Sequence, residues 1–99
     1  MDLILTYDIG TTACKSVLFS VDGTVVAMAE QEFPTRHPEP MWAEQDPDDW
    51  WQAVVSTTRS LMEGRENARI LSIGLSSQRE TIVTVDKQGK KLCDAILWM

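Results

Sequence analysis

The chain has 99 residues, of which 43% are hydrophobic and 24% are charged, so we expect one small globular domain. The net charge of −6 argues against binding of nucleic acid, although a local site and a metal ion can still favour phosphate ligands. The sequence contains no apolar stretch near the ~20 residues of a membrane span and no signal peptide, so we expect no membrane contact and a cytoplasmic location. Cys14 and Cys93 are too few and too far apart for a metal cluster, and we expect both to be reduced.

The first predicted element is a buried strand over residues 3–7, and a polar turn follows it. This stretch supplies a carboxylate, a glycine, two hydroxyls and a cation: Asp8, Gly10, Thr11, Thr12 and Lys15. Gly10 permits backbone conformations that a side chain would forbid, and hydroxyls with free backbone amides suit phosphate oxygens. Asp8 is placed to hold an accompanying metal ion, directly or through water. An ordinary hairpin turn with polar residues is the alternative left open.

Two more strands are predicted, at residues 16–20 and 25–29. Asp22 and Gly23 between them form a strong hairpin signal, so the first three strands should form an antiparallel meander. Three prolines then exclude regular structure between residues 33 and 41.

One clear helix is predicted over residues 47–63. Asp46 is suited to the N-cap and Pro47 to the first helical position. Apolar residues recur along this segment at steps of three and four, which is typical of a helix with one buried face. We expect Trp50 and Trp51 to pack in the core.

A buried strand at residues 70–75 should return through this helix to the same sheet. Gln78, Arg79 and Glu80 follow at its carboxyl end, where open α/β sheets bind their ligands. A guanidinium donates to vicinal hydroxyls and a carboxylate accepts from them, so Arg79 and Glu80 suit a polyhydroxylated ligand. A surface ion pair is the alternative left open.

A closing hairpin is predicted from residues 81–85, a turn at 86–90 and a returning strand at 92–98. The last residues, 95–99, are apolar, and an exposed apolar strand promotes aggregation. We therefore expect the chain to be the front piece of a longer protein. Docking of this end onto another partner is the alternative.

Several blocks of sequence, in the right order, resemble the amino-terminal part of the FGGY carbohydrate kinases, a family that includes glycerol kinase and xylulokinase. The main blocks are residues 8–12 with Lys15, 42–51, 73–81 and 94–98. The resemblance implies an α/β fold of the ribonuclease H-like (actin-like ATPase) kind, with two domains facing a cleft. Residues 1–99 would be the amino-terminal part of the first domain, and the second domain would be absent from them.

The resemblance also implies roles for the residues that match. It implies contacts to nucleotide and magnesium at Asp8, Gly10, Thr11, Thr12 and Lys15, and contacts to substrate at Arg79, Glu80 and Trp98. Glycerol kinases usually have arginine at the Lys15 position, and xylulokinases typically have Gln-Met-His-Gly at residues 78–81. The choice between a glycerol-type and a xylulose-type acceptor therefore stays open.

The activity implied is ATP-dependent transfer of a phosphoryl group to a hydroxyl of a sugar or polyol, with ATP and Mg²⁺ as cofactors. The general base would lie beyond residue 99, so residues 1–99 alone should show no kinase turnover. The implied partner is a small molecule, and a homo-oligomer of the full-length protein is left open. The alternative function is a non-catalytic binding or assembly module derived from a sugar kinase.

Overall fold

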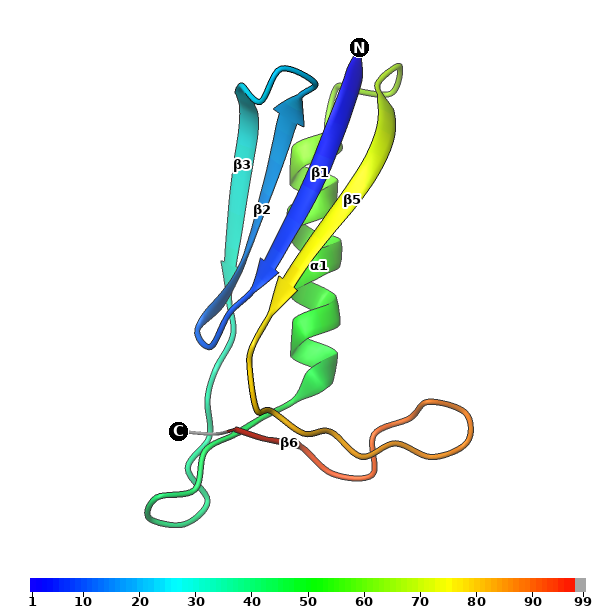
Figure 1. The fold of residues 1–99 in the computed structure, drawn as a ribbon. Coiled ribbons are helices and arrows are strands. Elements are labelled where there is room, and N and C mark those ends of the chain that lie inside the picture. The colour runs from blue at the N-terminus through cyan, green and yellow to red at the C-terminus, as the bar shows by residue number, and fades with distance from the viewer. Residues whose placement is uncertain (98–99) are drawn as a thin grey trace.

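A four-stranded sheet with one helix along one face forms the body of the computed structural model, which describes residues 1–97 (Figure 1). The sheet has the order β3-β2-β1-β5, from strands β1 (Asp2–Ile9), β2 (Ala13–Ser20), β3 (Val25–Glu32) and β5 (Arg69–Ser77). The helix is α1 (Pro47–Met62), and the short strands β4 (Glu44–Gln45) and β6 (Ala95–Ile96) pair with each other at one end of the molecule. None of the helices described is long and apolar enough to cross a membrane.

The predicted meander and the predicted crossover are both confirmed. β2 pairs antiparallel with β1 and β3, and β5 lies parallel to β1 after the crossover through α1. Each strand of the four-stranded sheet is longer than the apolar run that predicted it, because backbone pairing continues into polar residues such as Lys15, which pairs with Asp8 and Glu30.

Helix α1 begins as predicted. The side chain of Asp46 accepts a hydrogen bond of 2.9 Å from the backbone N–H of Asp48, which is the N-cap contact. The helix buries one stripe with a spacing of four residues: Ala53, Thr57 and Leu61. Trp50 lies near this stripe and is half-buried, but Trp51 lies further round the helix and is 64% exposed. The expectation that both tryptophans pack in the core is therefore wrong for Trp51.

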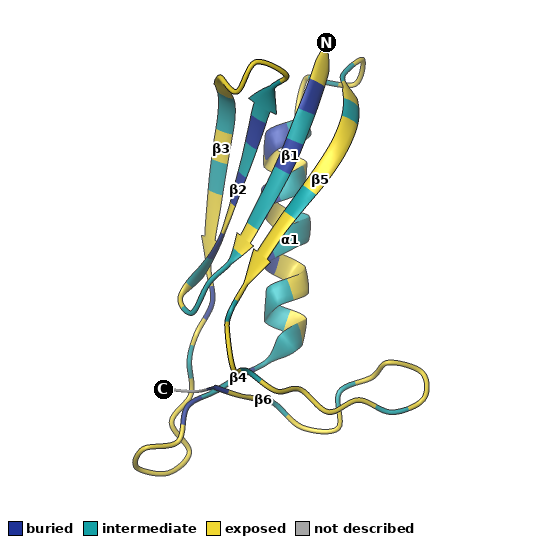
Figure 2. Ribbon diagram, in the orientation of Figure 1, coloured by how far each residue is buried: buried dark blue, intermediate teal, exposed yellow. Residues whose placement is uncertain are grey.

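The core lies between the sheet and α1, where the buried residues concentrate (Figure 2). Leu3 and Leu5 point toward the helix from β1, as the two-residue period of a strand requires. Ile73 and Leu75 on β5 are in register with Leu5 and Tyr7, yet they are 62% and 69% exposed. Helix α1 packs against β2 and β3, so it leaves this outer part of the same face uncovered.

The predicted closing hairpin is present as isolated bridges. Ile82 pairs with Ile96 and Val85 pairs with Lys91. The expected returning strand shortens to β6 among the described residues, since only isolated bridges pair the rest of the hairpin, and β6 also pairs with β4 in the loop that leads to α1. Trp98, at the end of that expected strand, lies outside the described residues.

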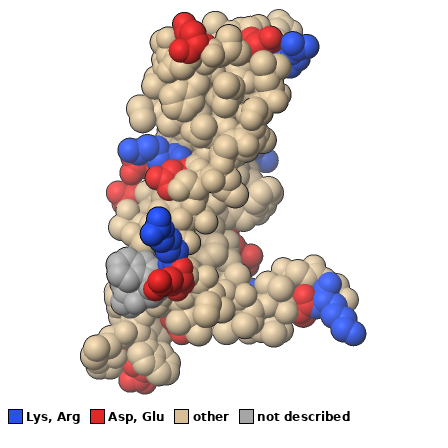
Figure 3. Space-filling view, viewed as in Figure 1, with Lys and Arg blue, Asp and Glu red and all other residues tan. Residues whose placement is uncertain are grey.

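Ion pairs fasten the segment before β6 to the start of α1. Lys91 Nζ lies 2.8 Å from Asp46 Oδ1 and 2.9 Å from Asp94 Oδ1, and Arg36 lies 3.2 Å from Asp94. The hydrogen bond from Lys91 lowers the pKa of Asp46 below its ordinary value of 3.8. Figure 3 shows that charged side chains on the visible face lie in small groups separated by uncharged surface.

The pKa of Asp46 predicts a pH-dependent effect of Asp46→Asn. Asparagine keeps the N-cap and removes the charge, so we expect a lower midpoint of urea unfolding near neutral pH. Because folding lowers this pKa, the ionised carboxylate stabilises the folded chain above pH 3.8, and the stabilisation is lost as the pH falls further. The midpoints of urea unfolding of the variant and the wild type should therefore become equal as the pH is lowered through this range. Asp48→Asn, at an exposed position of the first turn, is the control. A difference in the unfolding midpoint between Asp46→Asn and the wild type that persists in strong acid would contradict the stabilising role of the Asp46 carboxylate.

Candidate functional site

Two polar segments leave the sheet side by side: residues 10–12, here called the phosphate turn, and residues 79–80, the acceptor corner. β1 and β5 are parallel neighbours, and Ile9 is in register with Ser77. Parallel strands end at the same edge of a sheet, so both segments emerge there (Figure 1). Gln78, which immediately precedes the acceptor corner, links the two, because its Nε2 donates a 2.8 Å hydrogen bond to the carbonyl of Gly10.

The phosphate turn is tight and leaves two backbone amides without a hydrogen-bond partner in the described part of the chain. The N–H of Gly10 donates to the carbonyl of Ala13 at 3.0 Å, which closes the turn. Among residues 1–97, neither Thr11 nor Thr12 donates its backbone N–H to another group. Free amides at a turn of this kind are suited to phosphate oxygens.

We expected Gly10 to adopt a backbone conformation that a side chain would forbid, and the structure does not show this. Its φ lies outside the left-handed region, and a Cβ there would make an ordinary 3.6 Å contact with the carbonyl of Ala13. The conformation of the turn therefore does not require glycine, and a role for Gly10 rests on leaving room for a ligand.

Asp8 and Lys15 lie on the face of the sheet opposite α1. Asp8 alternates with core residues along β1 and is in register with Lys15 on β2. Both side chains are exposed, and the structure records no ion pair for either within the part of the chain it describes. They line an open groove of about 340 Å³ together with Thr6, Tyr7, Val17, Gly74, Leu75 and Ser76.

The carboxylate of Asp8 is not part of a cluster of metal-binding side chains in the described residues. In the described residues no group of three or more His, Cys, Asp and Glu side chains is placed to hold a metal ion. One carboxylate fits Mg²⁺ that arrives with a nucleotide, because this ion usually takes one or two carboxylates and completes its shell with phosphate oxygens and water.

The acceptor corner exposes both of its charged side chains. Arg79 and Glu80 form no ion pair with each other in the described structure, so the alternative of a surface ion pair is not what the geometry shows. Glu80 has φ +53°, a backbone conformation that side chains disfavour and that often marks functional sites. Trp98, the third predicted substrate residue, lies outside the described residues.

A buried glutamine, which sequence reasoning missed, connects these parts. Gln45 is 0% exposed, and its Nε2 donates to the carbonyl of Thr11 at 2.7 Å and to the hydroxyl of Thr35 at 2.8 Å. Its Oε1 accepts from Trp50 Nε1 and from Gln78 Nε2, both at 2.8 Å. The position of Gln45 within the 42–51 block was the one available signal, and that block served only to indicate the family resemblance.

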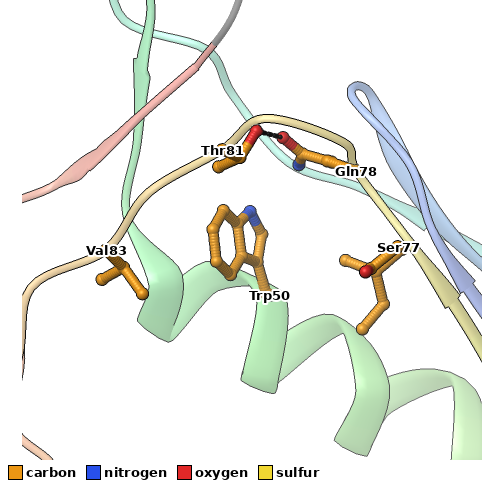
Figure 4. Close-up of a pocket in the computed structure, with 6 residues that line it drawn as sticks. Trp50, Ser77, Gln78, Thr81 and Val83 are labelled. Atoms are coloured by element: carbon orange, nitrogen blue, oxygen red, sulfur yellow. Dashed lines mark hydrogen bonds between the residues drawn. The ribbon is translucent and has the colours of Figure 1, made fainter.

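Trp50 and the segment after β5 enclose a small pocket of about 150 Å³. Figure 4 shows the indole nitrogen of Trp50 facing the segment that carries Gln78 and Thr81. The hydroxyl of Thr81 donates to Gln78 Oε1 at 2.9 Å, so this segment folds back over the indole and the carboxamide of Gln78 is held at both of its polar atoms.

Comparison with known sequences gives a consistent result. Residues 3–99 match the FGGY family of carbohydrate kinases, N-terminal domain. A glycerol kinase from Aquifex aeolicus is 38% identical over 99 residues, which are 99% of this chain and 20% of that protein. A glycerol kinase from Gluconobacter oxydans is 40% identical over 101 residues, covering 98% of this chain and 19% of that protein. The chain thus spans about one fifth of the length of these curated relatives.

Solved structures agree on the fold. Xylulose kinase from Rhodospirillum rubrum superposes with a TM-score of 0.91 at 30% identity, covering 96% of this chain and 20% of that chain. Plasmodium falciparum glycerol kinase with ADP gives a TM-score of 0.93 at 25% identity, covering 99% of this chain and 20% of that chain. Glycerol kinases and xylulose kinases both appear among the similar proteins, so the acceptor is not distinguished.

Proposed function

The chain belongs to the FGGY family of carbohydrate kinases, and from this we propose that the full-length protein transfers a phosphoryl group from ATP to a hydroxyl of a glycerol-type or xylulose-type acceptor. The observation that carries the proposal is the hydrogen bond between Gln78 and Gly10, which joins the phosphate turn to the acceptor corner. Two ligands held by these segments would be neighbours, and phosphoryl transfer requires this arrangement.

The nucleotide side of the proposed site supplies hydrogen-bond donors and positive charge. The free amides of Thr11 and Thr12 are directed to the phosphates, and Lys15 adds a cation beside them. Asp8 would hold the magnesium ion that accompanies the phosphates, and that ion would supply further positive charge there. Such groups stabilise the charge on the phosphoryl group as it moves.

The acceptor side supplies both kinds of hydrogen-bonding group. Arg79 donates to hydroxyl oxygens and Glu80 accepts from hydroxyl protons, and Trp98 covers the carbon chain of the acceptor. We assign no general base within residues 1–97, and we propose that this group lies beyond residue 99.

A coupled assay of the full-length protein with glycerol, xylulose, ribulose and erythritol tests the proposed function. We expect ADP formation that depends on at least one of these alcohols, and no turnover by residues 1–99 alone. ATP hydrolysis that no alcohol changes, or turnover by the isolated chain, would contradict the proposal.

Arg79→Ala should separate the two halves of the site. The loss of a charged hydrogen bond to the acceptor should raise the KM for the acceptor about 10- to 100-fold, while the KM for ATP stays within about twofold. Steady-state kinetics with each substrate varied in turn gives both values. Arg59→Ala, on the exposed surface of α1, is the control, and equal effects of Arg79→Ala on both KM values would remove Arg79 from the acceptor site.

A further inference from the structure

We infer that Gln78 and Gln45 are positioning residues that lock the phosphate turn to the acceptor corner, so that the two segments are held in one geometry relative to each other. The inference rests on the proposed function and adds a role for two side chains that touch neither substrate in it. Its physical basis is a pair of hydrogen-bonded carboxamides between the two segments, that of Gln45 fully buried and that of Gln78 partly buried.

Gln78 makes the direct link. It immediately precedes Arg79, and its Nε2 donates both to the carbonyl of Gly10 and to Gln45 Oε1 at 2.8 Å. Its Oε1 accepts from the hydroxyl of Thr81. Both donors and the acceptor of this carboxamide are therefore used, which leaves one orientation for it.

Gln45 makes the second link and anchors the first. Its carboxamide is fully buried and has two donor and two acceptor contacts. Rotation of this group would break four hydrogen bonds at a position where water cannot replace them. A buried polar network in which every group is satisfied is rigid for this reason. Trp50 connects the network to α1, which holds it against the body of the domain.

The two links fix which way the phosphate turn presents its amides. In a trans peptide the C=O of one residue and the N–H of the next point in opposite directions. The carbonyl of Gly10 is held by Gln78, so the N–H of Thr11 points away from it, and the carbonyl of Thr11 is held by Gln45, so the N–H of Thr12 points away likewise. The glutamines thus direct two free donors to the side where we place the phosphates.

Gln78→Met in the full-length protein tests this inference, because methionine keeps the length of the side chain and loses all of its hydrogen bonds. We expect the KM values for ATP and for the acceptor to rise together, each by about tenfold, which corresponds to the loss of roughly one hydrogen bond at each segment. Gln52→Met on the exposed surface of α1, where no side-chain hydrogen bond is recorded, should change neither. A purely structural role would lower the amount of folded enzyme, and hence the apparent kcat, without changing either KM.

Hydrogen–deuterium exchange provides a readout that does not depend on turnover. We expect peptides covering residues 9–13 to exchange faster in Gln78→Met, with α1 unchanged. If Gln78→Met does not fold, Thr81→Val removes the hydroxyl that donates to Gln78 Oε1 at 2.9 Å and, more weakly, to the carbonyl of Arg79 at 3.3 Å, and it should produce the same pattern with about threefold changes. A rise in only one KM, or unchanged exchange at the phosphate turn, would overturn the inference. Absence of acceptor-dependent turnover by the wild-type protein would instead refute the proposed function. The exchange experiment would still test whether Gln78 holds the phosphate turn in place.

Discussion

Gln45→Leu is expected to lower the free energy of unfolding by about 2–4 kcal/mol, because leucine occupies a similar volume but leaves several partly buried groups without partners. The indole N–H of Trp50, the carbonyl of Thr11 and one N–H of Gln78 all lose a hydrogen bond in partly buried surroundings. Each unsatisfied buried group costs about 1–3 kcal/mol, and local relaxation recovers part of the sum.

Urea unfolding of the wild type and the variant, followed by tryptophan fluorescence, measures this difference. Gln52→Leu is the matched control, since Gln52 is exposed on α1 and its replacement should change the free energy of unfolding by less than about 0.5 kcal/mol. A loss below about 1 kcal/mol for Gln45→Leu would show that the network around Gln45 does not hold the loops as described.

Asp8→Asn in the full-length protein should lower kcat by about 10²- to 10³-fold, because the carboxylate proposed to orient the phosphate-bound magnesium is lost where charge develops during transfer. The side chain of Asp8 is exposed and forms no ion pair in the described structure, so we expect the stability of the fold to change little. Steady-state kinetics at several magnesium concentrations should also show that the variant needs more of the ion for half-maximal rate.

Asp2→Asn is the control for this experiment. Asp2 lies at the other end of β1, where it pairs with Arg69, so its replacement should leave the dependence on magnesium unchanged. A kcat for Asp8→Asn within about threefold of the wild type would contradict the role proposed for Asp8.

The sequence predicted correctly those features of the fold that depend on residues close together in the chain. The turn at Gly23, which has φ +90°, and the N-cap at Asp46 depend on residues close in the chain, and both were predicted correctly. The placement of the phosphate turn beside the acceptor corner also follows from local elements, because a helical crossover returns β5 parallel to β1 and brings their carboxyl ends together.

The features that sequence reasoning missed depend on contacts between distant segments. β4 has two residues and exists because it pairs with β6 across the chain, which no local pattern indicates, whereas β6 lies within the strand predicted at residues 92–98. Trp51 belongs to an apolar pattern, but the buried stripe of α1 is set by where the helix meets the sheet. Gln45 resembles any polar loop residue until the fold brings Thr11, Trp50 and Gln78 around it.

A crystal structure of the full-length protein with an unreactive ATP analogue, magnesium and the acceptor found by the coupled assay tests the central claim most directly. We expect the terminal phosphate within hydrogen-bonding distance of the backbone amides of Thr11 and Thr12, and the acceptor hydroxyls on Arg79 and Glu80 in the same crevice. Binding of the nucleotide or the alcohol away from these two segments would contradict the account.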